Sequence, residues 1–409
     1  GTSNAYLLLK NLILSPIPHP RGQETMENSS MRKTSFIRLA VAATAVAVMA
    51  STTIPAQAAV KPSSKAAIGE DCLAGVIGKK SGTAVGRGIN GSDLTCMIVT
   101  TGSFKGKPKW WYKDMKPFTN LEWVSSSAIG GGYGTTAIAI GDAMKKEELV
   151  NDYTVTYRTN APLGLGYFYD QKNRNDLLII TGFAMPGGLA TNGSKLSITS
   201  SNPIAGIMRE AEAFVVPMNS KYKSINDLLA DIKANPKTVA IGGGNYGGVD
   251  HVTVATLAAT VGVKATDLNY IPYSGGGTLT PDVIGGRVAV GISGTSEFSS
   301  YVAAGKMRVL AVTSPKPLKV IKGKTLVQQG VDLTFGNWRG ILAPADLPAA
   351  DLLNTLKVID ALHSTQSWKD TLVAKSWIDE YRAGDAFSKW IKTENTAIIN
   401  VLTDFKLIK

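Results

Sequence analysis

The feature that most constrains the fold is an alternation of short apolar runs with helical patterns, which begins near residue 121. Such an alternation is typical of βα units that build a largely parallel sheet. A capping-box pattern from Ser224 to Asp227 opens one helix of the series. Between this box and residue 312, strands are expected at 238–241, 269–272, 288–292 and 308–312, and helices at 249–261, from 278 and at 296–304. The sequence therefore predicts an α/β protein.

The alternating part of the chain is expected to form two lobes. Residues 218–335 form one continuous lobe, and residues 119–217 plus 336–409 form a discontinuous one, which includes helices at 348–363 and 385–407. The chain then crosses between the lobes near 215–217 and returns near 335–338. Two crossings of this kind form a hinge.

Four glycine-rich turns lie where strands lead into helices: GGGYGTT at 130–136, GGGNYGG at 242–248, YSGGG at 273–277 and SGTSE at 293–297. In open α/β sheets, ligands bind beyond the carboxyl ends of the strands. A helix N-terminus there offers unpaired N–H groups and a partial positive charge to an anion. We therefore expect these turns to supply the ligand-binding residues: Gly131, Gly132, Tyr133, Gly134, Thr135, Thr136, Gly243, Gly244, Asn245, Tyr246, Gly247, Asp250, Ser274, Gly275, Gly276, Gly294, Thr295 and Ser296.

Four polar residues near these turns have two interpretations each. Asp250 and His251 suggest a catalytic pair, but an acid in the first turn of a helix is also favoured by the helix dipole. Glu297 is a first-turn acid or a general base, and Arg339 is a member of a hinge or core ion pair or a ligand clamp. The sequence leaves these alternatives open.

The N-terminal part of the chain carries an export pattern. Residues 31–58 combine a basic MRK start, an apolar run at 39–49 and an AQA cleavage motif at 56–58. The apolar run is shorter than the roughly 20 residues of a transmembrane helix. We expect an exported, periplasmic monomer without a lipid anchor, because no cysteine lies near the cleavage motif. Residues 1–30 have no coherent pattern and are interpreted as upstream sequence, with the natural start at Met26 or Met31.

Residues 59–118 form an additional polar, glycine-rich segment that contains Cys72 and Cys96. These are the 2 cysteines of the chain, and such a pair most often forms a disulfide in an oxidising compartment. The segment ends near Trp110 and Trp111, which either pack on the main body or dock a partner. With only 3 histidines in the sequence, no metal site is expected, and no cofactor either.

The net charge of +12 has two interpretations. It favours the steering of anions toward a cleft, or the lysines simply form a solvated surface. Nucleic-acid binding requires a basic stripe with interleaved aromatic residues, whereas the lysines here are scattered. Nucleic acid is therefore not expected as a partner.

Taken in order, the turns and their flanking segments resemble the substrate-binding proteins of tripartite tricarboxylate transporters, the TctC or Bug family. The segments that carry the resemblance are GGGYGTTAIAIGDAMKKEELV at 130–150, EAFVVPMNSKYKSINDLLADIKANP at 212–236, VAIGGGNYGGVDH at 239–251, YIPYSGGG at 270–277, VGISGTSEFSSYVAAGKMRVLAVTS at 290–314 and NWRGILAP at 337–344.

The resemblance covers about residues 121–409 and implies a two-lobed, hinge-linked periplasmic-binding-protein fold of type II. It also implies a small carboxylate ligand, such as a di- or tricarboxylate or an aromatic acid, held by backbone N–H groups, hydroxyls and waters. Delivery to a transporter with one large and one small membrane subunit is implied as well. The first turn departs from the family pattern, because Gly134 replaces an aspartate and Ile138 replaces an arginine.

Three alternatives compete with transport. The pattern G-x-G-x-x-G fits residues 242–247 and suggests a nucleotide-dependent enzyme, but the next strand ends in IPYS without the acid that would hold a ribose. Ser293 lies one residue short of the spacing of a hydrolase nucleophile, and too few histidines accompany it. We therefore expect no enzyme. A binding protein that senses its ligand for a signalling partner remains open, and neighbouring permease genes would separate the two roles.

Overall fold

A computed structural model describes residues 66–82 and 86–408. The export signal expected at 31–58 and the upstream residues 1–30 lie outside the described residues. In the part of the chain that is described, no helix has both the length and the apolar character needed to cross a membrane.

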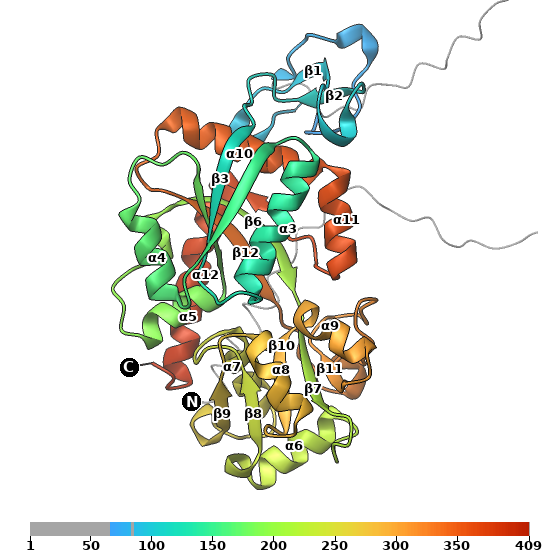
Figure 1. Ribbon diagram of the computed structural model, residues 1–409, viewed down its shortest axis with the longest axis vertical. Helices are drawn as coiled ribbons and strands as arrows, with labels where there is room; N and C mark the ends of the chain where they lie inside the picture. Colours follow the sequence, from blue (N-terminus) through green and yellow to red (C-terminus); the bar gives the residue numbers. More distant parts are fainter. Residues whose placement is uncertain (1–65, 83–85, 409) are drawn as a thin grey trace, which may run out of the picture. The chain divides into compact units, whose positions relative to one another are not determined.

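The alternating part of the chain builds two sheets (Figure 1). The first sheet has six strands in the order β13-β6-β12-β5-β3-β4, and the second has five in the order β11-β7-β10-β8-β9. The strands of the first sheet are β3 (Phe118–Ser125), β4 (Val150–Tyr157), β5 (Leu177–Gly182), β6 (Asn202–Glu210), β12 (Asn337–Ala343) and β13 (Arg382–Ala383). Those of the second are β7 (Glu212–Pro217), β8 (Ala240–Gly243), β9 (Asn269–Pro272), β10 (Val290–Gly294) and β11 (Met307–Val312).

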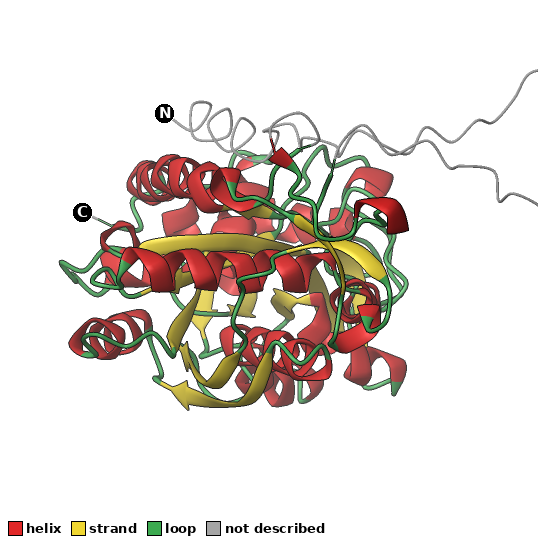
Figure 2. Cartoon of the chain, turned by 90° about the horizontal axis from the view of Figure 1, so that it is seen from above, coloured by secondary structure: helices red, strands yellow, loops and turns green. Residues whose placement is uncertain are grey.

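Helices cover both sheets, and Figure 2 shows them above and below the strands. The helices that accompany the first sheet are α3 (Gly132–Lys146), α4 (Ala161–Asp170), α5 (Ala184–Thr191), α10 (Ala349–Ser364), α11 (Gln366–Lys375) and α12 (Gly384–Asp404). Those of the second sheet are α6 (Ile225–Ala234), α7 (Val249–Ala259), α8 (Gly276–Ile284) and α9 (Thr295–Ala303). Each expected strand and helix after residue 224 is therefore present, with ends shifted by a few residues at most.

Both sheets are mixed, whereas the sequence predicted largely parallel ones. Pairings of β3 with β4 and β5, and of β8 with β9 and β10, are parallel. β7 runs antiparallel to β10 and β11, and β12 runs antiparallel to β5 and β6. β7 and β12 are the strands that enter each sheet directly from the other lobe. They have no helical crossover before them, so the rule that makes successive strands parallel does not apply.

The first change of sheet lies at Ala211, between β6 and β7. The sequence placed this crossing near 215–217, and the structure corrects it because these residues lie inside β7. The lobe built on the second sheet, called the second lobe below, has a hydrophobic core on each face of that sheet. Phe214 and Val216 belong to one core, and Ala213 and Val215 belong to the other, so β7 is buried on both faces. A run that is apolar on both faces does not show the alternation by which half-buried strands are recognised.

Thr313 joins the two crossings. Its hydroxyl accepts a hydrogen bond from the Glu212 N–H at 2.8 Å and donates to the Phe335 carbonyl at 2.8 Å. The Thr313 carbonyl in turn accepts from the Phe335 N–H at 3.0 Å. The first sheet resumes at Asn337, so the two lobes are connected through a compact pair of backbone segments.

The capping box predicted at Ser224 is present at the start of α6. The Ser224 hydroxyl accepts from the Asp227 N–H, and the Asp227 carboxylate accepts from the Ser224 N–H. This reciprocal pair satisfies two amides that the helix itself leaves without partners.

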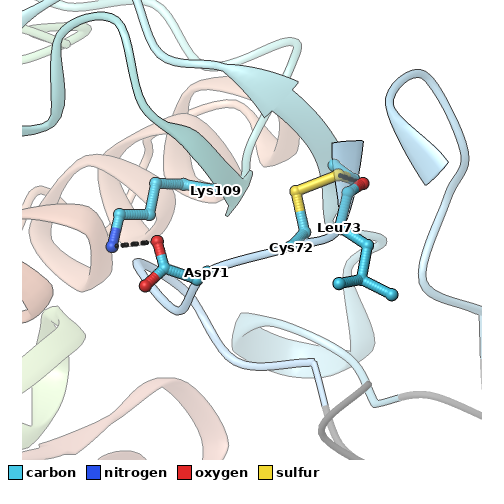
Figure 3. The surroundings of a disulfide bond; sticks show 5 residues. Asp71, Cys72, Leu73 and Lys109 are labelled. Atoms are coloured by element: carbon cyan, nitrogen blue, oxygen red, sulfur yellow. Dashed lines mark hydrogen bonds and ion pairs between the residues drawn. A yellow bond between two sulfur atoms is a disulfide. The ribbon is translucent and has the colours of Figure 1, made fainter. Parts of the chain in front are cut away.

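The additional N-terminal segment forms a small two-stranded sheet of β1 (Thr95–Ile98) and β2 (Pro108–Trp111). The expected disulfide joins Cys72 and Cys96, whose Cα atoms lie 5.8 Å apart. Figure 3 shows the ion pair beside it, in which Lys109 Nζ lies 2.9 Å from the Asp71 carboxylate. The disulfide fixes residues that precede β1 against the sheet.

The segment packs on α10. The Tyr112 hydroxyl donates to the Asp360 carboxylate at 2.5 Å, and Lys357 Nζ lies 2.8 Å from the Asp114 carboxylate. Trp110 and Trp111 are buried, with 8% and 5% of their surface exposed. Trp111 packs in the core of the main body, whereas Trp110 packs in the core of the segment itself. Packing on the main body is therefore confirmed for Trp111 alone, and neither tryptophan is available to dock a partner.

Replacement of both cysteines, Cys72→Ser with Cys96→Ser, is expected to loosen the N-terminal segment and leave the two lobes folded. A cross-link that closes a loop of this length stabilises the folded state by about 3 kcal/mol. Hydrogen exchange measures the effect, because the Cys96 N–H donates to the Lys79 carbonyl and exchanges faster once the segment opens. Amides of β8 and β10 serve as the internal control. Unchanged protection at residue 96 would contradict the assigned role of the disulfide.

Candidate functional site

Four helices begin at glycine residues that have no side chain to cap them. The N-cap residues are Gly131 for α3, Gly248 for α7, Gly275 for α8 and Gly294 for α9, and none makes a side-chain capping bond. The first-turn amides of a helix have no partners within the helix. A glycine cap therefore leaves these N–H groups to a ligand or to a distant side chain.

A cavity of about 80 Å³ lies where these helices start. Both lobes contribute to its walls. Of the residues expected to bind ligand, those that line it are Gly132, Tyr133, Gly244, Asn245, Asp250, Ser274 and Gly275. The other lining residues were not among those expected to bind ligand, although Gly248, Ser293 and Glu297 belong to the glycine-rich turns and Arg339 was considered as a ligand clamp. They are Ser126, Ser127, Ala184, Gly248, Val249, Ser293, Glu297, Asn337 and Arg339. Ser126 and Ser127 directly follow β3, so their position at a strand end was the signal that sequence reasoning missed.

The remaining expected residues lie near the cavity but do not line it. The hydroxyls of Thr135 and Thr136 donate to the Gly132 carbonyl at 3.0 and 2.8 Å, so both serve the first turn of α3. The Thr295 N–H donates to the Ala211 carbonyl at 3.0 Å. The others in this group are Gly131, Gly134, Gly243, Tyr246, Gly247, Gly276, Gly294 and Ser296.

The departure at Gly134 has a steric cause in this chain. A Cβ atom at this position would lie 2.5 Å from the Tyr157 ring. An aspartate in the same place would require Tyr157 to move. The position of the Tyr157 ring therefore depends on glycine at residue 134.

Carboxylates of the protein occupy amides at three of the glycine-rich turns. The Gly244 N–H donates to Asp250 Oδ2 at 2.6 Å, and the Gly276 N–H donates to Glu297 Oε2 at 2.7 Å. The Ser296 N–H donates to Glu210 Oε1 at 2.8 Å. The starts of α8 and α9 are thus each capped by a carboxylate from elsewhere in the chain. For these two helices, the partial positive charge is already compensated.

Arg339 is the basic residue that pairs with one of these acids, Glu210, and it is 2% exposed. Its Nη1 donates to Glu210 Oε2 at 2.8 Å and to Thr136 Oγ1 at 3.0 Å. The ion-pair interpretation of Arg339 is therefore confirmed. The residue also lines the cavity, and its Nε is buried without a hydrogen-bond partner among the described residues. Gly132 leaves room for the guanidinium, since a Cβ there would lie 2.1 Å from Nη2.

Burial raises the pKa values of the acids around the cavity. It raises the pKa of Asp250 to about 6 and, together with the charge of Glu210, the pKa of Glu297 to about 7. Glu212, which is fully buried, has a pKa well above its ordinary value because of burial and the Asp250 carboxylate. Burial and the neighbouring carboxylates therefore favour the protonated form of Glu212 more strongly than that of Asp250.

Asp250 and His251 do not form a catalytic pair. The His251 Nδ1 accepts a hydrogen bond from the Gly247 N–H at 3.1 Å, and burial lowers the pKa of this imidazole to about 4. The ring stacks on Tyr270 with centroids 4.1 Å apart. His251 is thus neutral and packs in the turn, whereas Asp250 binds the Gly244 amide.

Turns of the two lobes contact each other at the rim of the cavity. A Cβ atom on Gly187 of α5 would lie 2.2 Å from the Gly247 carbonyl oxygen, and one on Gly275 would lie 3.6 Å from the Gly131 Cα. The Thr191 hydroxyl lies 3.3 Å from the Tyr246 carbonyl. The cleft is therefore closed, and the contact at Gly187 leaves no room for a side chain.

A larger hollow of about 670 Å³ lies where the N-terminal segment meets α10. Its lining includes Asp114, Lys116 and Asn354, and none of the four glycine-rich turns contributes to it. No group of three or more His, Cys, Asp or Glu side chains within 66–82 and 86–408 is arranged to hold a metal ion. The convergence of helix N-termini therefore distinguishes the smaller cavity as the candidate site.

Comparison with known proteins gives a consistent picture. The model of a family described as "Tripartite tricarboxylate transporter family receptor" matches residues 193–379. The UPF0065 protein in the TAR-I ttuE-ttuC' intergenic region of Agrobacterium vitis is 26% identical over 243 residues, which cover 58% of this chain and 69% of that protein.

Two solved structures are similar in fold. The periplasmic binding protein BugD is 18% identical, with a TM-score of 0.63 and coverage of 72% of this chain and 100% of its own. MatC from Rhodopseudomonas palustris, with bound malate, is 17% identical, with a TM-score of 0.60 and coverage of 70% and 100%. The two-lobed periplasmic-binding fold expected from the sequence is confirmed.

The raised pKa values predict how stability depends on pH. In the unfolded chain Asp250 and Glu297 titrate near 3.8 and 4.5, and in the folded protein near 6 and 7. The folded state then binds more protons between about pH 4 and pH 7, so the stability contributed by these groups falls as the pH rises through this window. Each unit of pKa elevation corresponds to about 1.4 kcal/mol.

We expect Glu297→Gln and Asp250→Asn to raise the melting temperature relative to the parent at pH 8 more than at pH 4.5. The amide side chains still accept hydrogen bonds from Gly276 and Gly244 but carry no charge. Scanning calorimetry at the two pH values measures the difference. Equal effects at both would show that the two carboxylates are not destabilised by burial.

Proposed function

This chain belongs to the tripartite tricarboxylate transporter receptor (TctC/Bug) family, and we propose that it is an extracytoplasmic solute-binding protein for a small carboxylate. The carrying observation is the convergence of glycine-capped helix N-termini from both lobes on one closed cavity. Such N-termini favour anions without any need for a basic side chain.

The donors left for the ligand lie mainly at α3 and α7. No carboxylate caps the start of α3, and Arg339 lies against Gly132 there with its Nε unpaired among the described residues. A guanidinium and a helix N-terminus together make short, charge-assisted hydrogen bonds to a carboxylate. We propose that the carboxylate binds between the start of α3 and Arg339. Hydroxyls of Ser126 and Ser127 at the end of β3 lie in the same wall.

The size of the cavity restricts the ligand. A volume of about 80 Å³ is small for a ligand site, since such sites usually measure about 300–1,000 Å³. This favours a compact acid over a large aromatic one. MatC, which shares the fold, was solved with malate, an acid of similarly small size.

The cavity supports binding, and we propose no chemical reaction in it. No histidine is among the described residues that line it, and the hydroxyl of Ser293 donates to the Glu297 carboxylate at 3.2 Å. Glu297 also accepts from the Gly276 N–H, so we interpret this contact as packing between the starts of α8 and α9 and not as an activated nucleophile.

We further propose the route of delivery from the sequence and the family. The export pattern at 31–58 supports a periplasmic location, and the family supports a transporter with a large and a small membrane subunit. The protein is proposed to act as a monomer that releases its ligand when the lobes separate at the hinge.

The variant Gly187→Ala tests the proposed site. Alanine favours a helix by up to about 1 kcal/mol over glycine, so α5 itself is not weakened, but the new Cβ meets the Gly247 carbonyl and keeps the cleft from closing. We expect malate, succinate and adipate to raise the melting temperature of the parent by mass action. We also expect the variant to lose at least about tenfold in affinity, or about 1.4 kcal/mol.

The matched control is Gly166→Ala in α4, whose Cβ would lie 3.8 Å from Leu196 in ordinary contact. Calorimetric titration of the parent and both variants with the acid that gives the largest thermal shift completes the test. Full affinity in Gly187→Ala would move the site away from this cleft, and no shift with any acid would refute the proposed function.

A further inference from the structure

The walls of the cavity differ in charge between the two lobes. The first lobe contributes Arg339 from β12, and the second contributes Asp250 from α7 and Glu297 from α9. Arg339 is already paired with Glu210, which is fully buried behind the cavity. The second lobe therefore faces the cavity with carboxylates that have no basic side chain of their own among the lining residues.

A ligand with carboxylates alone fits this wall poorly. Its negative charges would lie beside Asp250 and Glu297 in a confined space, where like charges repel strongly because little water screens them. The amides that might have compensated for this, those of Gly244 and Gly276, already bind the two side chains. The second lobe is thus suited to a positively charged group.

A further polar group at the cavity lacks a partner. Asn337 lines the cavity and is 7% exposed, and its Oδ1 is buried without a hydrogen-bond partner among the described residues. Buried polar atoms are almost always hydrogen-bonded in folded proteins. Together with the unpaired Nε of Arg339, this points to a ligand that supplies both donors and acceptors.

We infer that the ligand is a small amino-carboxylate, whose carboxylate binds at Arg339 and the start of α3 and whose protonated amino group binds between Asp250 and Glu297. The inference rests on the proposed function and specifies the ligand class of the same site. A zwitterion of this kind links the basic wall of one lobe to the acidic wall of the other, so its binding favours the closed cleft. The hydroxyl of Ser293, bound to Glu297, lies in the wall that receives the amino group.

A metal ion is a poorer occupant of the acidic wall. The described residues contain no cluster of three or more suitable ligands. Asp250 and Glu297 each direct an oxygen to a backbone amide, which leaves too few carboxylate oxygens for the six to eight ligands of calcium.

Matched pairs of acids that differ only in the amino group test the inference. Calorimetric titrations at pH 7.5 compare L-aspartate with succinate and β-alanine with propionate. We expect at least one amino acid to bind no less than tenfold tighter than its partner acid. In the variants Glu297→Gln and Asp250→Asn, the ratio of the affinity for the amino acid to the affinity for its partner acid is expected to fall toward one. The fall comes mainly from weaker binding of the amino acid.

Glu147→Gln is the matched control. Glu147 is also buried and accepts from the backbone N–H groups of Ser103 and Ser367, at 2.7 and 3.3 Å, but it does not line the cavity. This variant is expected to keep the parent ratio, which separates a charge effect at the site from a general effect of losing a buried carboxylate.

The outcomes separate the inference from the proposed function. Equal or tighter binding of succinate and propionate, or binding of malate or adipate without any amino acid, overturns the inference and leaves the proposed function standing. A preference for the amino acid that persists unchanged in both acidic-wall variants also overturns it. If no acid of either kind binds, both proposals fail.

Discussion

The buried pair of Glu210 and Arg339 is the interaction on which the arrangement of the cleft depends. Glu210 ends β6 directly before the first crossing and accepts from the Ser296 N–H of the other lobe while it pairs with Arg339. One carboxylate thus holds a strand end, a helix start and a guanidinium together. Removing one partner of a buried pair usually costs about 3–5 kcal/mol, because the other charge is left without compensation. Burying the two charges has a desolvation cost that largely offsets their attraction, so the intact pair adds little net stability. Its expected role is to fix the geometry of the hinge.

Glycine caps and distant acids are two parts of the same arrangement. Glycine at the starts of α8 and α9 leaves amides that no local side chain satisfies, and Glu297 and Glu210 satisfy them from elsewhere. Among residues 66–82 and 86–408, no carboxylate from another element accepts a hydrogen bond at the starts of α3 and α7. Of these four helix N-termini, those of α8 and α9 are therefore compensated by carboxylates of the protein, whereas those of α3 and α7 keep amides for an anion. The capacity to bind an anion is greatest near Arg339, which lies against the start of α3.

The sequence predicted the elements well because their signals are local. The capping box at Ser224 and the glycine turns depend on residues close together in the chain, and the structure contains them. The disulfide was also predicted, since the chain has a single pair of cysteines. The first crossing was misplaced, because 215–217 lie in a strand buried on both faces and so show no alternation.

The charge pattern of the cleft was beyond sequence reasoning. Glu210 meets Ser296 across 86 positions and Arg339 across 129, and no local pattern indicates such pairings. Glu297 was recognised as a first-turn acid, but its bond to Gly276 depends on how α8 packs on α9. Seven of the predicted residues do line the cavity, but no local pattern separates them from the predicted residues that do not, because the cavity forms only where the two lobes meet.

The central claim is that the protein's own carboxylates hold amides of the glycine-rich turns. Glycine-selective ¹⁵N labelling allows the amide resonances of Gly244 and Gly276 to be followed between pH 5 and pH 8. A carboxylate that accepts from an amide shifts its resonance when it titrates, so the account predicts midpoints near 6 for Gly244 and near 7 for Gly276. Resonances that stay constant across this range would contradict it.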